Sequence, residues 1–572
     1  GDYYIKVNEK VEYFSTLLSS GALINNLSLP YVFDTVADFK VSSIEFPDGK
    51  TIHLRDRGAD FTKISGQSGT GTETIPSVAI NQSITIVEED ILIPEKYGAT
   101  GLGDNAETDN EIFEILFTKN KPMLLVNDYL VSKRFTTDKW VVSGGGRITL
   151  TSTNFGFLTC TGSNSIIEGI TFKGAGNPGQ VRLSTDLCLS FNNYSAQNNT
   201  VRNCHFKDFT FYAIELKSKG STIEGNRFDN IGYWAIISAN RFNYITHNTF
   251  VSCAMSTGGS YVGGCITVSY IESDGYTMAT TRAERNYILY NTISTTNQVG
   301  IDTHSGYNLV IVGNIISDAA LEAIYLHRTS YTDQGLTDAD GRVTNCIIEH
   351  NSIKNCFGGV LLSSYGDDAI ESTGCVNNII QNNLIENTSD WGITLARGSR
   401  NNTVQDNEVI GGTRLIYIFY WCTDNLVKGN KLSADNLTRR MIDINANSLY
   451  STDDNIIEDN YLNFNNQTDV RGVRNRLGCE GTLIKNNEFF NRGNYLPILD
   501  DEAGTLRQAR IVYKPRGYTA ASSATREISD MQGEVIENML PIAGGNRGWI
   551  CVTSGDEAST TGVWKEYGTI EA

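Results

Sequence analysis

The sequence predicts an all-β chain whose main part is a right-handed parallel β-helix with small modules at both ends. Three observations support this prediction: a phrase with Asn at one fixed position recurs along the chain, a phrase of alternating apolar residues follows each copy, and the shortest spacing between copies matches one solenoid coil. We assign residues 94–503 to the β-helix and the catalytic site, with the repeated coils running from about 140 to 500.

The two ends of the chain lack this repeat. Residues 1–93 have a helix-like start and short strands, as in "VFDTVADFKVSSIEFPDGKTIHLRDRG", and predict a small α/β module without a chemical motif. The stretch "YGATGLGDNAETDNEIFEILF" (97–117) places Gly-rich turns and an Asp-rich helix start before the first coils. Residues 504–572 contain short apolar segments and predict a small C-terminal β module.

The first repeated phrase has an apolar residue, two variable residues, Asn, one variable residue and another apolar residue, as in "TIEGNRF" and "IIQNNLI". Successive copies are 22 to 43 residues apart, so the longer steps are coils with insertions. An inward Asn is costly unless identical amides stack at about 4.8 Å and bond to one another along the axis. We therefore expect a buried ladder. Its positions are Asn226, Asn248, Asn291, Asn314, Asn351, Asn383, Asn407, Asn430, Asn460 and Asn487, and Cys204 and Ile170 take the same place in two earlier phrases.

The second phrase reads AIEL, AIIS, CITV, GIDT, AIYL, GVLL, GITL, LIYI and MIDI in successive coils. Its Ile or Val face should point inward and the alternate residues outward. The three longest steps carry their extra residues after this strand, at 270–284, 329–343 and 364–376. Because the "GIDTH" coil has no such insertion, the pattern predicts a cleft there, in which the insertions of other coils form the walls and the "GIDTH" strand forms an open floor.

Composition and charge exclude several functions. A net charge of −19 argues against partners that need a basic surface, so we expect no nucleic acid and no anionic membrane surface. Eleven cysteines without a CxxC pair predict buried thiols, with no disulfide framework, metal or cofactor. No apolar run approaches the roughly 18 residues of a spanning helix and no signal peptide is present, so we expect a soluble protein without membrane insertion. The start at Gly1 rather than Met indicates a processed or truncated chain.

Titratable residues recur on two adjacent coils, in "GIDTH" (300–304) and "AIYLHR" (323–328). Alternation places Asp302 and His304 outward on the first strand, and Tyr325 and His327 outward on the second. If the coils stack in register, Asp302 lies beside Tyr325 and His304 beside His327, and Arg328 follows at the strand end.

This patch suits the cleavage of a glycosidic bond, which usually requires two carboxyl groups about 5 to 9.5 Å apart. Asp302 is the first candidate. Its partner stays open: Glu322 points inward by parity with Ile324 unless the chain bends, whereas Asp367 and Asp368 lie on a loop two coils away, at about 9.6 Å. The histidines could orient a carboxylate, bind substrate or act as a base. The catalytic candidates are therefore Asp302, Glu322, Asp367, Asp368, His304 and His327, and the substrate-binding candidates are Tyr325, Arg328, Tyr365, Trp391 and Arg397.

The chain resembles the bacteriophage tailspikes of the pectate-lyase-like β-helix superfamily, specifically the depolymerases of capsular or surface polysaccharides. The resemblance rests on the Asn-bearing coils, on the entry segment "YGATGLGDNAETDNEIF" and on the C-terminal "GWICVTSGDEASTTGVWKEYG". It implies a parallel homotrimer that is attached to the phage tail or baseplate through a missing N-terminal segment. It also implies a virion protein that cuts bacterial capsule or O-antigen with an endo mode of action.

The resemblance transfers no catalytic residue, because the family shares no single catalytic motif. "GDDAIES" (366–372) is similar to the paired aspartates of polygalacturonases, but their Gly-His-Gly and Arg-x-Lys patterns are absent, as is a calcium loop of the polyuronate lyases. Three functions stay open: a glycoside hydrolase, a lyase with His304, His327 or Tyr325 as base beside Arg328, and a carbohydrate-binding adhesin.

Overall fold

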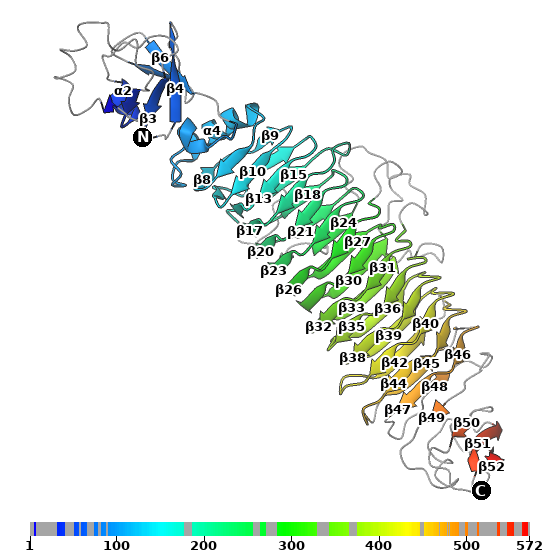
Figure 1. Cartoon of the computed structure of the whole chain (residues 1–572). Coiled ribbons are helices and arrows are strands. Elements are labelled where there is room, and N and C mark those ends of the chain that lie inside the picture. Colours follow the sequence, from blue (N-terminus) through cyan, green and yellow to red (C-terminus); the bar gives the residue numbers. More distant parts are fainter. Residues whose placement is uncertain are drawn as a thin grey trace, which may run out of the picture.

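The computed structural model describes residues 5–6, 31–40, 51–56, 59–65, 74–77, 82–86, 90–176, 186–255, 263–269, 283–328, 342–364, 374–446, 451–467, 470–476, 479, 481–490, 498–500, 512–513, 535–537, 546–553 and 563–569. These residues form an elongated stack of β-coils with a small sheet before it and short strands after it (Figure 1). Among the described residues, no helix is long and apolar enough to cross a membrane.

A six-stranded sheet precedes the coils, in the order β1-β2-β3-β4-β6-β5. Its elements are β1 (Ile5–Lys6), β2 (Tyr31–Phe33), α2 (Val36–Lys40), β3 (Thr51–Leu54), β4 (Ala59–Ser65), β5 (Thr74–Ser77) and β6 (Gln82–Ile86).

Two helices connect this sheet to the coils, α3 (Pro94–Tyr97) and α4 (Ala106–Thr118). The side chain of Asn105 caps α4 by accepting a hydrogen bond from the backbone N–H of Thr108 over 3.1 Å, which confirms the predicted helix start. Phe113 of α4 packs edge-on against Tyr129 and Phe157, so the helix covers the core of the first coils.

Each coil supplies one strand to each of three parallel sheets. The β7 sheet contains β7 (Met123–Leu125), β10 (Val141–Gly144), β13 (Ile166–Glu168), β16 (Thr200–Arg202), β19 (Thr222–Glu224), β22 (Tyr244–Thr246), β25 (Tyr287–Leu289), β28 (Val310–Val312), β31 (Ile347–Glu349), β34 (Ile379–Gln381), β37 (Thr403–Gln405), β40 (Leu426–Lys428), β43 (Ile456–Glu458) and β46 (Leu483–Lys485).

The β8 sheet contains β8 (Asp128–Val131), β11 (Arg147–Leu150), β14 (Thr171–Lys173), β17 (His205–Phe209), β20 (Arg227–Ile231), β23 (Thr249–Cys253), β26 (Thr292–Thr296), β29 (Ile315–Ala319), β32 (Ser352–Lys354), β35 (Leu384–Glu386), β38 (Glu408–Ile410), β41 (Lys431–Ser433), β44 (Tyr461–Asn463) and β47 (Glu488–Phe490). It continues into β49 (Val512–Tyr513) and β50 (Val535–Glu537), which pairs antiparallel with β51 (Asn546–Thr553), and β51 pairs in the same way with β52 (Val563–Thr569).

The β9 sheet contains β9 (Phe135–Thr137), β12 (Leu158–Cys160), β15 (Leu187–Phe191), β18 (Tyr212–Leu216), β21 (Trp234–Ser238), β24 (Gly264–Ser269), β27 (Val299–His304), β30 (Glu322–Arg328), β33 (Gly358–Ser364), β36 (Trp391–Ala396), β39 (Arg414–Phe419), β42 (Arg440–Asn445), β45 (Arg471–Asn475) and β48 (Ile498–Asp500). The second repeated phrase therefore forms one sheet, as predicted.

The coils begin earlier than the expected start near residue 140. Met123 of β7 already pairs with Val142 of β10, and Phe135 of β9 pairs with Leu158 of β12. The first coils lack the Asn phrase because aromatic side chains fill their interior, including Trp140, Phe157 and Phe172.

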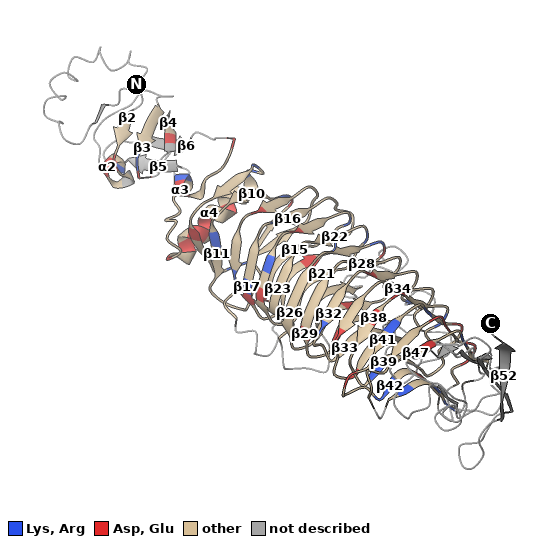
Figure 2. Cartoon of the chain, turned by 60° about the horizontal axis from the view of Figure 1, so that its bottom comes forward, with Lys and Arg blue, Asp and Glu red and all other residues tan. Residues whose placement is uncertain are grey.

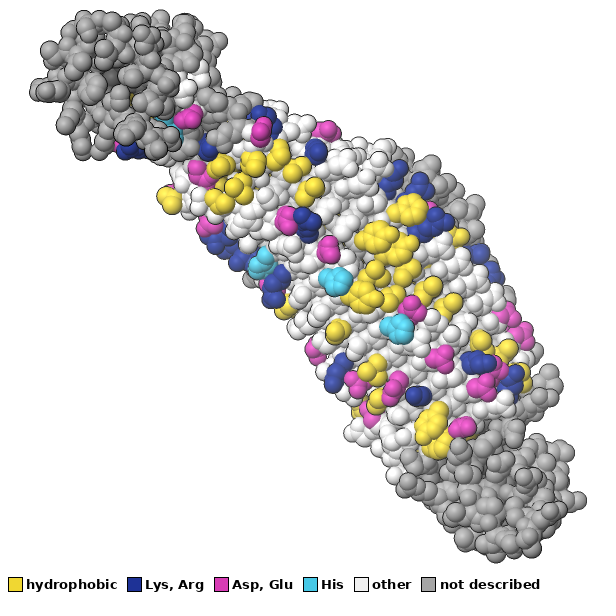
Figure 3. Space-filling view, in the orientation of Figure 1, with side chains coloured by type: hydrophobic (Ala, Val, Ile, Leu, Met, Phe, Trp, Pro, Cys, Tyr) yellow, Lys and Arg dark blue, Asp and Glu magenta, His cyan; other side chains and the backbone are white. Residues whose placement is uncertain are grey.

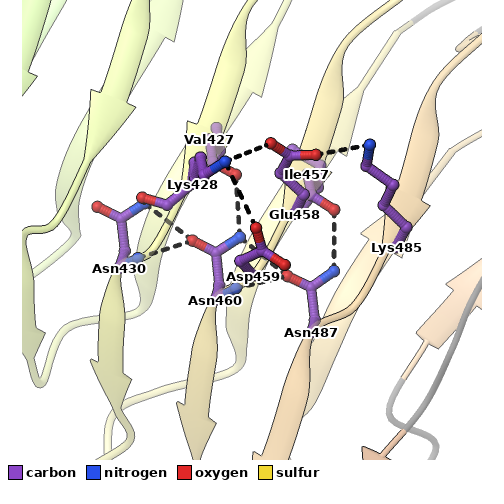
Figure 4. Close-up of polar contacts among 9 residues, drawn as sticks. All are labelled: Val427, Lys428, Asn430, Ile457, Glu458, Asp459, Asn460, Lys485 and Asn487. Carbon is purple, nitrogen blue, oxygen red and sulfur yellow. Dashed lines mark hydrogen bonds and ion pairs between the residues drawn. The ribbon is translucent and has the colours of Figure 1, made fainter.

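The Asn ladder is present as predicted. All ten side chains are buried, and each amide donates to the Oδ1 atom of the next Asn along the axis; the nine links run from Asn226 to Asn487. Figure 4 shows Asn430, Asn460 and Asn487 on successive coils, joined by hydrogen bonds of 2.9 Å, beside a row in which Glu458 bridges Lys428 and Lys485. These bonds satisfy amides that would otherwise destabilise the interior.

A second amide ladder was not predicted. Asn378 donates to Asn402, Asn402 to Asn425, and Asn425 to Asn455, over 2.9 to 3.0 Å, and all four are buried. Each lies five residues before a member of the first ladder, so an Asn-x-x-x-x-Asn spacing was the signal in the sequence.

The remaining core is apolar. The rings of Phe206, Phe228 and Phe250 stack on successive coils with centroids 5.0 and 4.8 Å apart. The ten cysteines whose side chains are described are buried thiols, as expected. Figure 3 shows charged side chains of both signs scattered over the visible face, with hydrophobic side chains gathered in patches along the solenoid.

Candidate active site

Strands β27 and β30 bring the titratable residues together in the predicted register. Asp302 pairs with Tyr325, and His304 pairs with His327. The sequence prediction of these neighbours is therefore confirmed.

Asp302 lies on the outward side of β27, but its side chain is fully buried. Its Oδ2 lies 2.8 Å from Nε2 of His304, and its Oδ1 lies 3.3 Å from Nε2 of His327. Gly264 flanks it on β24, where an added Cβ would lie 3.0 Å from the Cβ of Asp302. The expected open floor is therefore wrong at this residue, because the two imidazoles and the neighbouring strand cover the carboxylate.

Glu322 does not follow the parity expected from Ile324. Glu322 pairs with Gly358, where an added Cβ would meet the half-buried indole of Trp391, and the charge of Asp302 acts on Glu322, so residue 322 lies on the side of Asp302. The next two residues of β30, Ala323 and Ile324, are both fully buried and point inward in succession. The same pair occurs in β27: a Cβ on Gly300 would lie 3.0 Å from the core atom Cγ2 of Ile316, beside the inward Ile301. A small residue before the apolar one was the signal for this local irregularity, which alternation alone misses.

The two carboxyl groups have opposite pKa shifts. Burial alone would raise the pKa of Asp302, but the charges of His304 and His327 and the hydrogen bond with His304 outweigh it, so the pKa lies well below its usual range. Burial and, to a smaller extent, the charge of Asp302 raise the pKa of Glu322. There is thus a pH range in which Asp302 is ionised while Glu322 still holds its proton. Such a pair assigns the basic role to Asp302 and the acidic role to Glu322.

Aromatic rings surround this pair. The ring of Tyr325 stacks on His327 at 4.4 Å, and His304 contacts Trp234 edge-on at 6.0 Å. Burial and the nearby Asp302 raise the pKa of Tyr325, so this phenol is a poor base at neutral pH.

Trp391 lies in the same outward row as Glu322. Glu322 pairs with Gly358, and Gly358 pairs with Trp391. A Cβ on Gly358 would meet the indole Nε1 at 2.3 Å, so the indole ring occupies the space over this glycine, next to Glu322. The half-buried Trp391 therefore presents a ring beside the candidate acid.

Arg397 is half-buried just after β36, and its charge opposes to a small extent the rise in the pKa of Tyr325 that burial, Asp302 and Glu322 cause. Arg328 ends β30, but its side chain lies outside the described residues. Tyr365, Asp367 and Asp368 lie outside them too, together with most of the predicted insertions at 270–284, 329–343 and 364–376.

Sequence reasoning missed an aromatic cluster on the coils before the site. Tyr212 of β18 stacks on Trp234 of β21 at 5.1 Å, and Tyr233 and Phe211 extend the stack. The signals were the dipeptides "FY" (211–212) and "YW" (233–234), which occupy equivalent positions in neighbouring coils. Through Trp234 the cluster reaches His304.

Within the described part of the chain, one set of side chains could hold a metal ion, although none was expected. Donor atoms of Asp302, His304 and His327 all lie within 4.8 Å of one another. A carboxylate with two imidazoles is a donor set that suits divalent transition metals. Asp302 already lies at ion-pair distance from both imidazoles, so the geometry also fits a metal-free charge-stabilised carboxylate.

Comparisons with known proteins agree with the coils. The family description "Right handed beta helix region" matches residues 195–370 and 339–432. No curated protein matches the sequence.

The similar solved structures include the enzymatically active domain of tailspike protein 2 of bacteriophage CBA120, at 12% identity and a TM-score of 0.45, covering 73% of this chain and 60% of that one. Another is the catalytic unit of a GH87 α-1,3-glucanase from Streptomyces thermodiastaticus, at 12% identity and a TM-score of 0.47, covering 74% and 72%. A third is a mutant tailspike protein of Escherichia coli bacteriophage HK620 in complex with a pentasaccharide, at 11% identity and a TM-score of 0.43, covering 68% and 74%. The chain thus spans about three fifths of the first of these structures.

Proposed function

We propose that this tailspike-like right-handed β-helix protein is a glycoside hydrolase that cuts a polysaccharide on the outward side of the β9 sheet, around β27 and β30. The observation that supports this most is the pair Asp302 and Glu322, two neighbouring carboxyl groups with opposite pKa shifts on one side of the sheet. Glycosidic cleavage needs one protonated and one ionised carboxyl group.

In this proposal Glu322 donates a proton to the leaving oxygen. Asp302 remains ionised and holds His304, whose side chain is 22% exposed and whose neutral imidazole accepts a proton from the attacking water. Trp391 supplies an apolar surface beside the acid on which a sugar ring can lie. Asp302 acts through His304.

The proposed substrate is a bacterial surface polysaccharide, either capsule or O-antigen. The proposed setting is a phage tail, with a homotrimer attached through an N-terminal segment and residues 94–503 as the catalytic domain. The entry and C-terminal motifs that resemble tailspikes support this setting, and the charge of −19 fits a protein that does not bind nucleic acid. Light scattering should give three times the chain mass, and a monomer at micromolar concentration would contradict the trimer.

The experiment is digestion of a panel of capsular and O-antigen polysaccharides, with mass spectrometry of the products. A hydrolase gives new reducing ends and fragments heavier than the repeat by one water. Binding without any fragment would make the protein an adhesin and reject the proposal.

A lyase is the second candidate, because His304 and His327 place two imidazoles at the ionised Asp302. An imidazole oriented by a carboxylate can remove the proton next to the carboxylate of a uronic acid. The product would be unsaturated, would absorb ultraviolet light and would lack the added water.

A further inference from the structure

A second charged cluster lies on the outward side of the same β9 sheet, on β39, β42 and β45. Arg414, Arg440 and Arg471 occupy one position on the three successive strands. In a neighbouring row, Asp443 of β42 pairs with Arg474 of β45. Figure 2 shows Lys and Arg segments gathered at β42, toward the C-terminal end of the coils.

Asp443 lies at the centre of this cluster and is fully buried. Its Oδ2 lies 3.3 Å from Nη1 of Arg440 and 3.5 Å from Nε of Arg414, and its Oδ1 lies 3.9 Å from Nε of Arg476. Neither carboxylate oxygen accepts a well-formed hydrogen bond within the described part of the chain. The arginines therefore surround the carboxylate at ion-pair distance without saturating it or themselves.

Positive charge exceeds negative charge among the described side chains at ion-pair distance. Arg414 has a further partner in Asp390, at 3.0 Å, so the three arginines that contact Asp443 (Arg414, Arg440 and Arg476) share two carboxylates. Burial lowers the pKa of Arg440, and the guanidinium groups of Arg474, Arg476 and Arg414 lower it further against the opposing effect of Asp443. Such mutual repulsion favours the binding of an anion from outside.

The guanidinium groups are accessible to such an anion. The side chains of Arg414, Arg440 and Arg476 are 23%, 21% and 30% exposed. The Nε atoms of Arg440 and Arg476 are buried and donate no hydrogen bond within the described residues. The planar fork of a guanidinium matches the two oxygens of a carboxylate, sulfate or phosphate group.

We propose that this arginine cluster (Arg414, Arg440, Arg474 and Arg476 around Asp443) binds the anionic substituents of an acidic polysaccharide. The inference rests on the proposed function in taking a glycan as the ligand. It goes further in assigning that glycan a negative charge and a second contact region.

The position of the cluster supports a glycan rather than a small anion. Asp443 lies five strands from Asp302 in the β9 sheet, or about 24 Å at the spacing of neighbouring strands. Tyr417 and Phe419 on β39 stack at 4.4 Å, and the guanidinium of Arg414 lies 4.6 Å from the Tyr417 ring centroid. An extended chain of sugars could therefore meet both an aromatic surface and the arginines while it reaches the candidate acids.

The test measures binding of the full chain to three polymers by calorimetry at low salt: polygalacturonate, dextran sulfate and neutral dextran. Polygalacturonate presents carboxylates and dextran sulfate presents sulfate esters, so the two distinguish the anionic group. Arg440→Gln should weaken binding of the preferred acidic polymer about tenfold or more, since hydrogen bonds with charged groups are strong. Arg202→Gln, an exposed arginine paired with Glu168 on the β7 sheet, should leave binding unchanged.

Asp443→Asn should change the affinity for acidic polymer in the opposite direction from Arg440→Gln. Misfolding of a variant would not produce such a gain in affinity. It removes the internal anion that competes with the ligand, so acidic polymer should bind more tightly. If the cluster only stabilised the fold, Asp443→Asn would lower the unfolding temperature without tighter binding. Equal binding by the parent and both variants, or no preference for acidic over neutral polymer, would overturn the inference.

These results separate the inference from the proposed function. Cleavage of a neutral polysaccharide that depends on Glu322 but not on Arg440 would uphold the hydrolase and reject the anion site. Tight binding of acidic polymer that depends on Arg440, without cleavage of any polysaccharide, would uphold the anion site and reject the hydrolase.

Discussion

Oδ2 of Asp302 lies 2.8 Å from Nε2 of His304, and the carboxylate of Asp302 is fully buried while His304 reaches the surface. Because Nε2 faces the carboxylate, Nδ1 is the ring nitrogen left to exchange a proton with substrate or water. The geometry therefore connects the buried charge of Asp302 to the accessible imidazole of His304. In this way Asp302, which has no contact with solvent, can act on a glycan bound at the surface.

The first prediction concerns the pH dependence of cleavage. Glu322 must be protonated to act as the acid, and its pKa is raised, so activity should be lost as pH rises through that pKa. Asp302 must be ionised, and its pKa lies well below its usual range, so it should cause no loss of activity in mildly acidic solution. The measurement is kcat/KM against pH.

Variants test this assignment. Glu322→Gln should lower the rate of cleavage at least about a hundredfold. Glu408→Gln, which changes an exposed acid on β38, should leave the rate unchanged. In the residual activity of Asp302→Asn, the alkaline limb should move to lower pH, because the charge of Asp302 helps to raise the pKa of Glu322. An alkaline limb that persists in Glu322→Gln would remove this residue from the role of acid.

The second prediction separates acid–base chemistry from metal chemistry at Asp302, His304 and His327. Under the proposed mechanism, dialysis against a chelator leaves cleavage unchanged. Loss of activity that is restored by one divalent ion would make the three residues metal ligands instead. Metal analysis of the purified protein provides an independent readout.

The third prediction concerns the stability of the amide ladder. The Nδ2 group of Asn383 donates to Asn407 and to the carbonyl of Ile348, and its Oδ1 accepts from the amide of Asn351. Each of these three hydrogen bonds has a donor–acceptor distance of 2.9 Å. Asn383→Ala leaves buried groups unsatisfied, at a cost of about 1–3 kcal/mol each. The thermal unfolding midpoint should therefore fall, while the same change at the exposed Asn192 should leave it unchanged. Equal midpoints for both variants would contradict the stabilising role of the ladder.

The sequence predicted those features that follow from repetition. The coil period placed the Asn side chains in one inward row, and the period-two alternation placed Asp302 beside Tyr325. Glu322 was misplaced because β30 has two successive inward residues, which strict alternation does not allow. The burial of Asp302 depends on the packing of His304, His327 and Gly264 around it, so no local pattern reveals it.

The arginine cluster also escaped prediction from the sequence. Arg414, Arg440 and Arg471 are 26 and 31 residues apart, and only the register of coils with different lengths brings them into one row. Asp443 occupies the position in its coil that Asp302 occupies in "GIDT", as the phrases "MIDI" and "GIDT" already suggested. The different neighbours of these two acids give the two sites different chemistry.

The most direct test of the account is the rate at which Asp302→Asn releases reducing ends from a polysaccharide that the parent protein cleaves. The account predicts a folded protein that still binds the polysaccharide and cleaves it about 10² to 10⁴ times more slowly. The matched control Asp186→Asn, which changes another buried acid in the β9 sheet region, should keep the parent rate. Near-normal cleavage by Asp302→Asn, or an unsaturated product from the parent protein, would contradict it.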